Sequence, residues 1–141
     1  MKKDLCSFNM AKALKALGFN REIRYCYTPE TGRLTRWNNY TLPFCYIPAP
    51  TVDQAIDWIR EKYDVVIYNH VPPFVNPKDK QNRIIYIYGV KFCNRRDGWN
   101  GRVAISCGRM SHNIYAAKRM AIMEAIRWIK KNRICSKKTK K

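Results

Sequence analysis

The chain has 141 residues, and 28 of them are Lys or Arg against 10 Asp or Glu, so the formal net charge is +18. Hydrophobic residues make up 46% and aromatic residues 13%, which is enough for a buried core and excludes a disordered chain. There is no apolar run of about 18 residues, and residues 1–19 lack a continuous apolar stretch, so we expect neither a membrane span nor a signal peptide.

The first predicted element is a helix from Phe8 to Leu17. Its apolar residues recur every three or four positions, and Gly18 follows as a natural stop. Two aromatic-rich runs come next, residues 21–28 and 36–47, with the turn signal "PETG" between them. We expect these runs to form a β-hairpin. Pro43 and Pro48 keep its second arm short or at a sheet edge.

The sequence "APTVDQAIDWIREKY" predicts a second helix. Thr51 and Gln54 have the spacing of a capping box, and Val52 begins an apolar stripe that ends at Tyr63. A strand is expected from Val65 to Tyr68. Residues 71–82 contain three prolines and are predicted to be a long loop.

Residues 83–93, "RIIYIYGVKFC", alternate in the manner of a strand, with Ile84, Tyr86, Tyr88, Val90 and Phe92 on one face. The dipeptides Asp97-Gly98 and Asn100-Gly101 then favour a hairpin turn. "RVAISC" at residues 102–107 is expected to return as a third strand.

The last predicted helix runs from about Asn113 to Lys131, with Ser111 as its N-cap. Ala117, Ala121 and Ala125 share one face, and side chains of this size let a helix approach a sheet closely. We therefore predict one α+β domain over residues 1–135, in which helices pack on one face of an antiparallel sheet. A disordered basic tail is expected at residues 136–141.

From Thr51 onward the predicted order is helix, three strands, helix. Residues 51–131 resemble a double-stranded RNA-binding domain. This resemblance rests on the passage "YDVVIYNHVPP" and on an Ala-Lys-x-x-Ala-x-x-x-Ala pattern, formed here by Ala117, Lys118, Ala121 and Ala125. It implies an αβββα core and contacts to a duplex backbone.

The chain departs from that family where the last helix begins. The family has adjacent lysines there that clamp phosphates, whereas this chain has "HNIY", with Arg109 and Lys118 as the nearest cations. The loop after the first strand also lacks the family's glycine and histidine. RNA, duplex DNA and single strands therefore all stay open as ligands.

The whole chain also resembles a set of small uncharacterised proteins of phages and mobile elements from gut Bacteroidetes. The residues that carry this resemblance are "KALGF" at 15–19, the segment "APTVDQAIDWIREKY", and a helical end that alternates alanines and lysines. It implies a small accessory protein in a bacterial cytoplasm, without implying an activity.

The positive charge is concentrated at one end of the chain. Residues 1–82 carry 12 basic and 8 acidic side chains, whereas residues 83–141 carry 16 and 2. A field of one sign attracts polyanions. We expect the binding surface to combine the last helix, the 94–102 hairpin and the tail, and its candidate residues are Arg95, Arg96, Trp99, Arg102, Arg109, Lys118, Arg119, Arg127, Lys130 and Lys131.

The cations of this set would contact phosphates with a salt-dependent affinity. Trp99 is placed in "RRDGWNG", where a hairpin tip would present its ring for stacking on a base. For most of the other aromatic residues we expect core or sheet-face positions, and such a position is also the alternative for Trp99. For the cations the alternative is a solvated face that only aids solubility.

The sequence contains no phosphate-binding glycine loop and no Asp/Glu cluster for Mg²⁺. Its six cysteines form no Cys-x-x-Cys and are expected to be free and mostly buried. Cys107 and His112 are close in sequence, an arrangement that we attribute to coincidence. We therefore expect no enzyme, no metal and no cofactor.

These observations predict a small basic nucleic-acid-binding accessory protein of phage or mobile-element origin, located in the cytoplasm of a bacterial host. It would contact the phosphate backbone by charge and shape. The alternative is a non-enzymatic phage protein that binds an acidic host protein, as an anti-defence or host-takeover inhibitor. A membrane is not among the expected partners.

Overall fold

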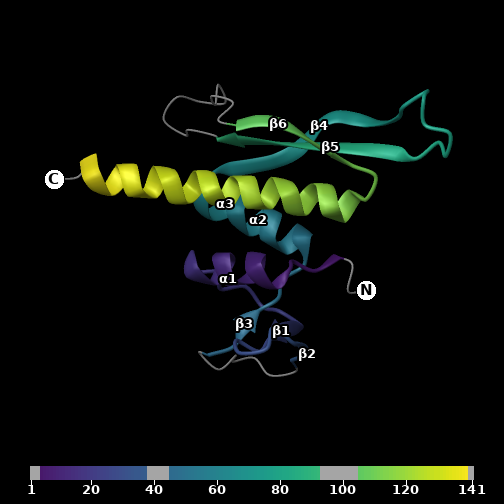
Figure 1. Cartoon of the computed structure of the whole chain (residues 1–141). Coiled ribbons are helices and arrows are strands. Elements are labelled where there is room, and N and C mark those ends of the chain that lie inside the picture. Colours follow the sequence, from purple (N-terminus) through teal and green to yellow (C-terminus); the bar gives the residue numbers. More distant parts are fainter. Residues whose placement is uncertain (1–3, 38–44, 93–104, 140–141) are drawn as a thin grey trace. The chain divides into compact units, whose positions relative to one another are not determined.

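The computed structural model describes residues 4–37, 45–92 and 105–139 (Figure 1). The helices and strands follow in the order α1 (Phe8–Ala16), β1 (Tyr25–Tyr27), β2 (Leu34–Arg36), β3 (Ile47–Pro48), α2 (Val52–Tyr63), β4 (Val65–Val75), β5 (Ile84–Phe92), β6 (Ile105–Ser111) and α3 (Ile114–Thr139). The mixture of helices with antiparallel strands confirms the predicted α+β class.

The chain forms two compact units, residues 1–58 and 59–141, and the boundary falls within α2. The first unit contains an antiparallel sheet of order β2-β1-β3. The second contains an antiparallel sheet of order β4-β5-β6, with α3 in contact with all three strands.

Helix α1 begins and ends close to its predicted bounds. The Ser7 hydroxyl accepts a hydrogen bond from the Met10 amide, and Gly18 adopts a left-handed backbone with φ of 93° just after the helix. Ala11 and Leu14 are fully buried on the inner face. The apolar spacing of the sequence was therefore sufficient to locate this helix.

The hairpin predicted around "PETG" is confirmed as β1 and β2, which pair from Tyr25 opposite Arg36 to Tyr27 opposite Leu34, but its second strand is Leu34–Arg36 and not the predicted run at residues 36–47. Gly32 has a φ of 66° in the turn, and its amide donates to the Thr28 carbonyl at 2.9 Å. Strand β3 pairs with the other edge of β1, so the hairpin is part of a three-stranded sheet. Pro48 lies in β3, an edge strand, as predicted.

Helix α2 starts with the predicted capping box. The Gln54 amide donates to the Thr51 hydroxyl at 3.1 Å, and the Thr51 amide donates to the Gln54 side-chain carbonyl at 2.9 Å. Trp58, which the stripe did not include, is also buried, and its indole N–H donates to the Asn20 side chain.

Strand β4 corrects the predicted loop at residues 71–82, because it continues to Val75. Its register with β5 shifts between Asn69 and Val71 and again between Val71 and Phe74. These irregularities accommodate Pro72 and Pro73, which have no amide to donate. β4 is an edge strand, where missing donors are tolerated.

The predicted alternation of β5 is correct at one end only. Val90 is 3% exposed and pairs with the buried Ile67, but Ile84 is 46% exposed whereas Ile85 is 8% exposed. The hairpin of β4 and β5 projects past the start of α3, so the helix does not cover Ile84 (Figure 1).

The start of α3 also differs from the prediction. β6 continues to Ser111, and the N-cap is Asn113, whose side-chain oxygen accepts from the amides of Tyr115 and Ala116 at 2.9 and 3.2 Å. Ser111 instead accepts from the Asn113 amide. At its other end α3 runs past Lys131 to Thr139, through most of the predicted tail.

Two described cysteines are buried, Cys6 and Cys26, and burial raises the pKa of the Cys26 thiol. Cys45 is exposed, so two of the three described cysteines follow the prediction of mostly buried thiols. All three are free. Within the described residues, no helix has the length and apolar character to cross a membrane.

The capping box gives a stability prediction. Thr51→Ala removes the acceptor of the Gln54 amide and should lower the free energy of unfolding by about 1 kcal/mol, whereas Thr51→Ser should retain most of it. Urea unfolding of the three proteins checks this. Equal midpoints for wild type and Thr51→Ala would contradict the capping role.

Candidate nucleic-acid interface

Helix α3 separates its buried and cationic sides. Its fully or nearly fully buried positions are Ala117, Ala121, Ile122, Ala125, Ile126 and Ile129. Arg127, Lys130 and Lys131 are exposed and stand three and four residues apart, which places them on one side of the helix. We call these three residues the α3 cation ridge.

Arg119 and Lys118 lie earlier in the helix, and both are half-buried. Lys130 follows Arg119 by eleven positions, which is about three full helical turns, so the two side chains leave the helix within about 20° of the same direction. Lys118 and Arg127 are nine residues apart, a rotation of about 180°. The Lys118 ammonium lies 5.9 Å from the centre of the Tyr88 ring in β5. Lys118 is therefore directed to the sheet, away from the α3 cation ridge.

The α3 cation ridge has one acidic neighbour in the helix. Glu124 accepts from the Arg127 guanidinium at 2.9 Å, and the Arg127 side chain is 62% exposed whereas that of Glu124 is 30% exposed. A pair of this kind contributes little to stability and exchanges readily for another anion. Among the described residues, Lys130 and Lys131 make no ion pair. The ridge thus keeps its charge available to a ligand.

Five of the ten predicted binding residues have side chains outside the part of the chain that the structure describes. Arg95, Arg96, Trp99 and Arg102 lie outside the described residues. Arg109 occupies β6 opposite Tyr88, and its side chain is also outside them. Their convergence with α3 stays a prediction.

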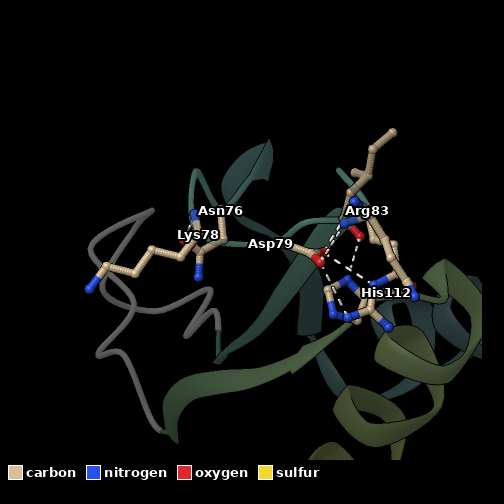
Figure 2. A network of polar contacts seen from close by, with 7 residues as sticks. Asn76, Lys78, Asp79, Arg83 and His112 are labelled. Carbon is tan, nitrogen blue, oxygen red and sulfur yellow. Dashed lines mark hydrogen bonds and ion pairs between the residues drawn. The ribbon is translucent and has the colours of Figure 1, made fainter.

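A hollow that the sequence did not indicate lies at the end of the β4–β5 hairpin (Figure 2). It has a volume of about 430 Å³. The turn between the strands and the junction of β6 with α3 form its walls, and its lining residues are Asn76, Lys78, Asp79, Arg83, Ile85, Ser111 and His112.

Asp79 organises the turn. One carboxylate oxygen accepts from the Arg83 amide at 3.2 Å and from Arg83 Nε at 3.1 Å, and the other accepts from the Gln81 amide at 3.1 Å. The hydrogen bond from the Arg83 side chain, followed by that from the Gln81 amide, lowers the pKa of the Asp79 carboxyl. Asn82 completes the turn with a φ of 52°.

His112, at the junction of β6 with α3, contacts the start of β5. Its Nδ1 lies 3.2 Å from the Ile84 carbonyl oxygen. Because a carbonyl only accepts, this contact requires the proton on Nδ1. His112 therefore has a positioning contact of its own, and Cys107, its sequence neighbour, has a side chain outside the described residues.

One signal for the hollow was present in the sequence. Asp79 and Arg83 have the spacing of an ion pair across a tight turn. The nearby prolines, however, favoured the prediction of a long loop. The contribution of His112 depends on tertiary contacts, and no local pattern could show it. In the described part of the chain, no three His, Cys, Asp or Glu side chains gather as a metal site would require.

Comparison of the chain with protein-family models, with curated proteins and with solved structures finds no match. The assignment of function consequently rests on the site itself.

The hydrogen bonds of Asp79 predict how its pKa responds to a mutation of Arg83. Arg83→Met should raise the pKa of Asp79 toward its ordinary value of 3.8, because the largest cause of the shift is removed. The lowered pKa means that this pair stabilises the fold above the unfolded carboxyl's pKa, and that the contribution is lost as pH falls through the folded value. Carboxyl-carbon NMR checks this, with Lys78→Met as control. An unchanged Asp79 pKa in Arg83→Met would refute it.

Proposed function

We propose that the protein binds nucleic acid by its phosphate backbone, through the α3 cation ridge. The observation that carries this proposal is the exposure of Arg127, Lys130 and Lys131 on one side of α3, with Glu124 as the single acid in the whole helix. An exposed helix face of ordinary soluble proteins mixes both signs of charge. Phosphate contacts need cations that project together and lack strong acidic partners.

The element order supports a more specific interpretation. The succession α2, β4, β5, β6, α3, with an antiparallel sheet and alanines on the buried side of α3, is what a double-stranded RNA-binding-like core requires. Shape recognition of a duplex is the mode that this core would support. The missing clamp lysines shift the phosphate contacts from the start of α3 toward its second half.

The proposed biological setting is a phage or mobile-element accessory protein in a bacterial cytoplasm. In that setting an acidic host protein is the competing ligand for the same ridge. We favour nucleic acid because a cluster of exposed cations with a single acidic neighbour attracts the phosphates of a backbone. The acidic protein is the other outcome of the test below.

The test measures fluorescence anisotropy of labelled 20-nucleotide duplex RNA, duplex DNA and single-stranded DNA over a series of salt concentrations. Each lost phosphate contact lowers the slope of log affinity against log salt by about 0.9 on duplex DNA. The triple variant Arg127→Gln, Lys130→Gln, Lys131→Gln should therefore reduce that slope by roughly 3.

The matched control removes three exposed cations of the first unit, by Lys12→Gln, Arg33→Gln and Arg36→Gln. It has the same net charge as the ridge variant and should keep most of the slope. Equal slopes in the two variants would contradict the proposal, because binding would then depend on net charge and not on the position of the cations. Binding of polyglutamate as tight as binding of duplex would favour the acidic protein.

A further inference from the structure

We propose that the hollow at the end of the β4–β5 hairpin receives one unpaired nucleotide of the bound nucleic acid. This inference rests on the proposed function and specifies its substrate. It assigns a role to the residues labelled in Figure 2, none of which belongs to the α3 cation ridge.

The hollow combines an apolar floor with polar walls. Ile85 is 8% exposed and forms the floor, while Asn76, Ser111 and His112 supply polar atoms. Its volume of about 430 Å³ lies in the range of sites that hold small molecules. A nucleobase has the same division, with apolar faces and a hydrogen-bonding edge.

An exposed aromatic residue, Phe74, pairs with Ile85 in the sheet, although it is not among the lining residues of the hollow. Phe74 is directly opposite Ile85 in the β4–β5 register, and residues opposite each other in an antiparallel pair project from the same face. Phe74 remains 40% exposed, unusually open for a phenyl ring. Stacking on a base would cover it, and every base has a face to offer.

The cationic wall is held in place before any ligand binds. Asp79 engages Nε of Arg83 at 3.1 Å, yet the Arg83 side chain is still 52% exposed. The guanidinium is therefore oriented while some of its five N–H donors remain directed to solvent. A phosphate flanking the bound base could accept from it, with Lys78 also at the rim.

A paired nucleotide does not fit this arrangement. In a duplex both faces of a base are stacked and its edge is paired, so only an unpaired or extruded base can reach a hollow. Helix α3 begins at Ile114, and from there to Arg127 it rises about 20 Å. The hollow and the ridge can thus engage one ligand when the unpaired nucleotide adjoins a duplex of about six base pairs or more.

The test compares a blunt 20-base-pair duplex with the same duplex that carries one central unpaired adenosine, each as RNA and as DNA, on the full chain. The wild type should bind the bulged duplex at least about fivefold more tightly. Phe74→Leu and Arg83→Met should bring that ratio close to one. The ridge variant should weaken both duplexes and keep the ratio.

Ile84→Ala is the matched control, because Ile84 is also exposed at this hairpin end but is adjacent in sequence to Ile85 and so projects from the opposite face. It should keep the preference. In the wild type, 2-aminopurine at the unpaired position should change its fluorescence on binding, a readout independent of whether the variants fold.

The outcomes separate the two proposals. Equal wild-type affinity for bulged and blunt duplex, or an unchanged 2-aminopurine signal, overturns the nucleotide site and leaves the ridge standing. A preference that survives both Phe74→Leu and Arg83→Met also overturns it. Failure to bind either duplex overturns the proposed function together with this inference.

Discussion

The close packing of α3 on the β4-β5-β6 sheet determines which charges the second unit presents. Ala117, Ala121 and Ala125 are at most 5% exposed, and their small side chains fix the rotation of the helix about its axis. With that rotation fixed, Arg127, Lys130 and Lys131 must face solvent, and Lys118 must face Tyr88. A single larger residue in the alanine row would change this distribution of charge as well as the packing. The proposed binding surface is thus a consequence of core geometry.

The same sheet also creates the second feature of the unit. Because β4 and β5 are longer than the part that α3 covers, their far end projects and leaves Phe74 and Ile84 exposed. The Asp79 carboxylate closes the turn, and His112 links the junction before α3 to the start of β5. The hollow therefore exists because the turn after β4 and the junction before α3 meet at the end of the β4–β5 hairpin. Ridge and hollow lie on one helix–sheet unit, so their separation is set by the length of α3.

The sequence predicted correctly those features that depend on interactions between residues a few positions apart. The capping box at Thr51 and Gln54, the apolar period of α1 and the turn at Gly32 each involve residues a few positions apart, and the structure confirms all three. The predictions were wrong where tertiary pairing overrides local preference. Pro72 and Pro73 indicated a loop, but an edge strand with bulges tolerates them.

The candidate site divides in the same way. The composition showed that the last helix is rich in cations. The direction of each side chain depends on the rotation of α3 about its axis, so the sequence could not show that Lys118 and Arg127 point to different sides. Ser111 and Asn113 are both good capping residues, and only the extent of β6 decides between them. The hollow is lined by residues as far apart in the chain as Asp79 and His112, and no pattern within one segment could bring them together.

The most direct measurement is lysine footprinting by mass spectrometry on the full chain, with and without saturating duplex. If the α3 cation ridge contacts phosphates, Lys130 and Lys131 will lose reactivity when duplex is added, whereas Lys12 and Lys62, exposed on other helices, will keep theirs. Unchanged reactivity at Lys130 and Lys131 in a saturated complex, or equal protection of all four lysines, would contradict the account.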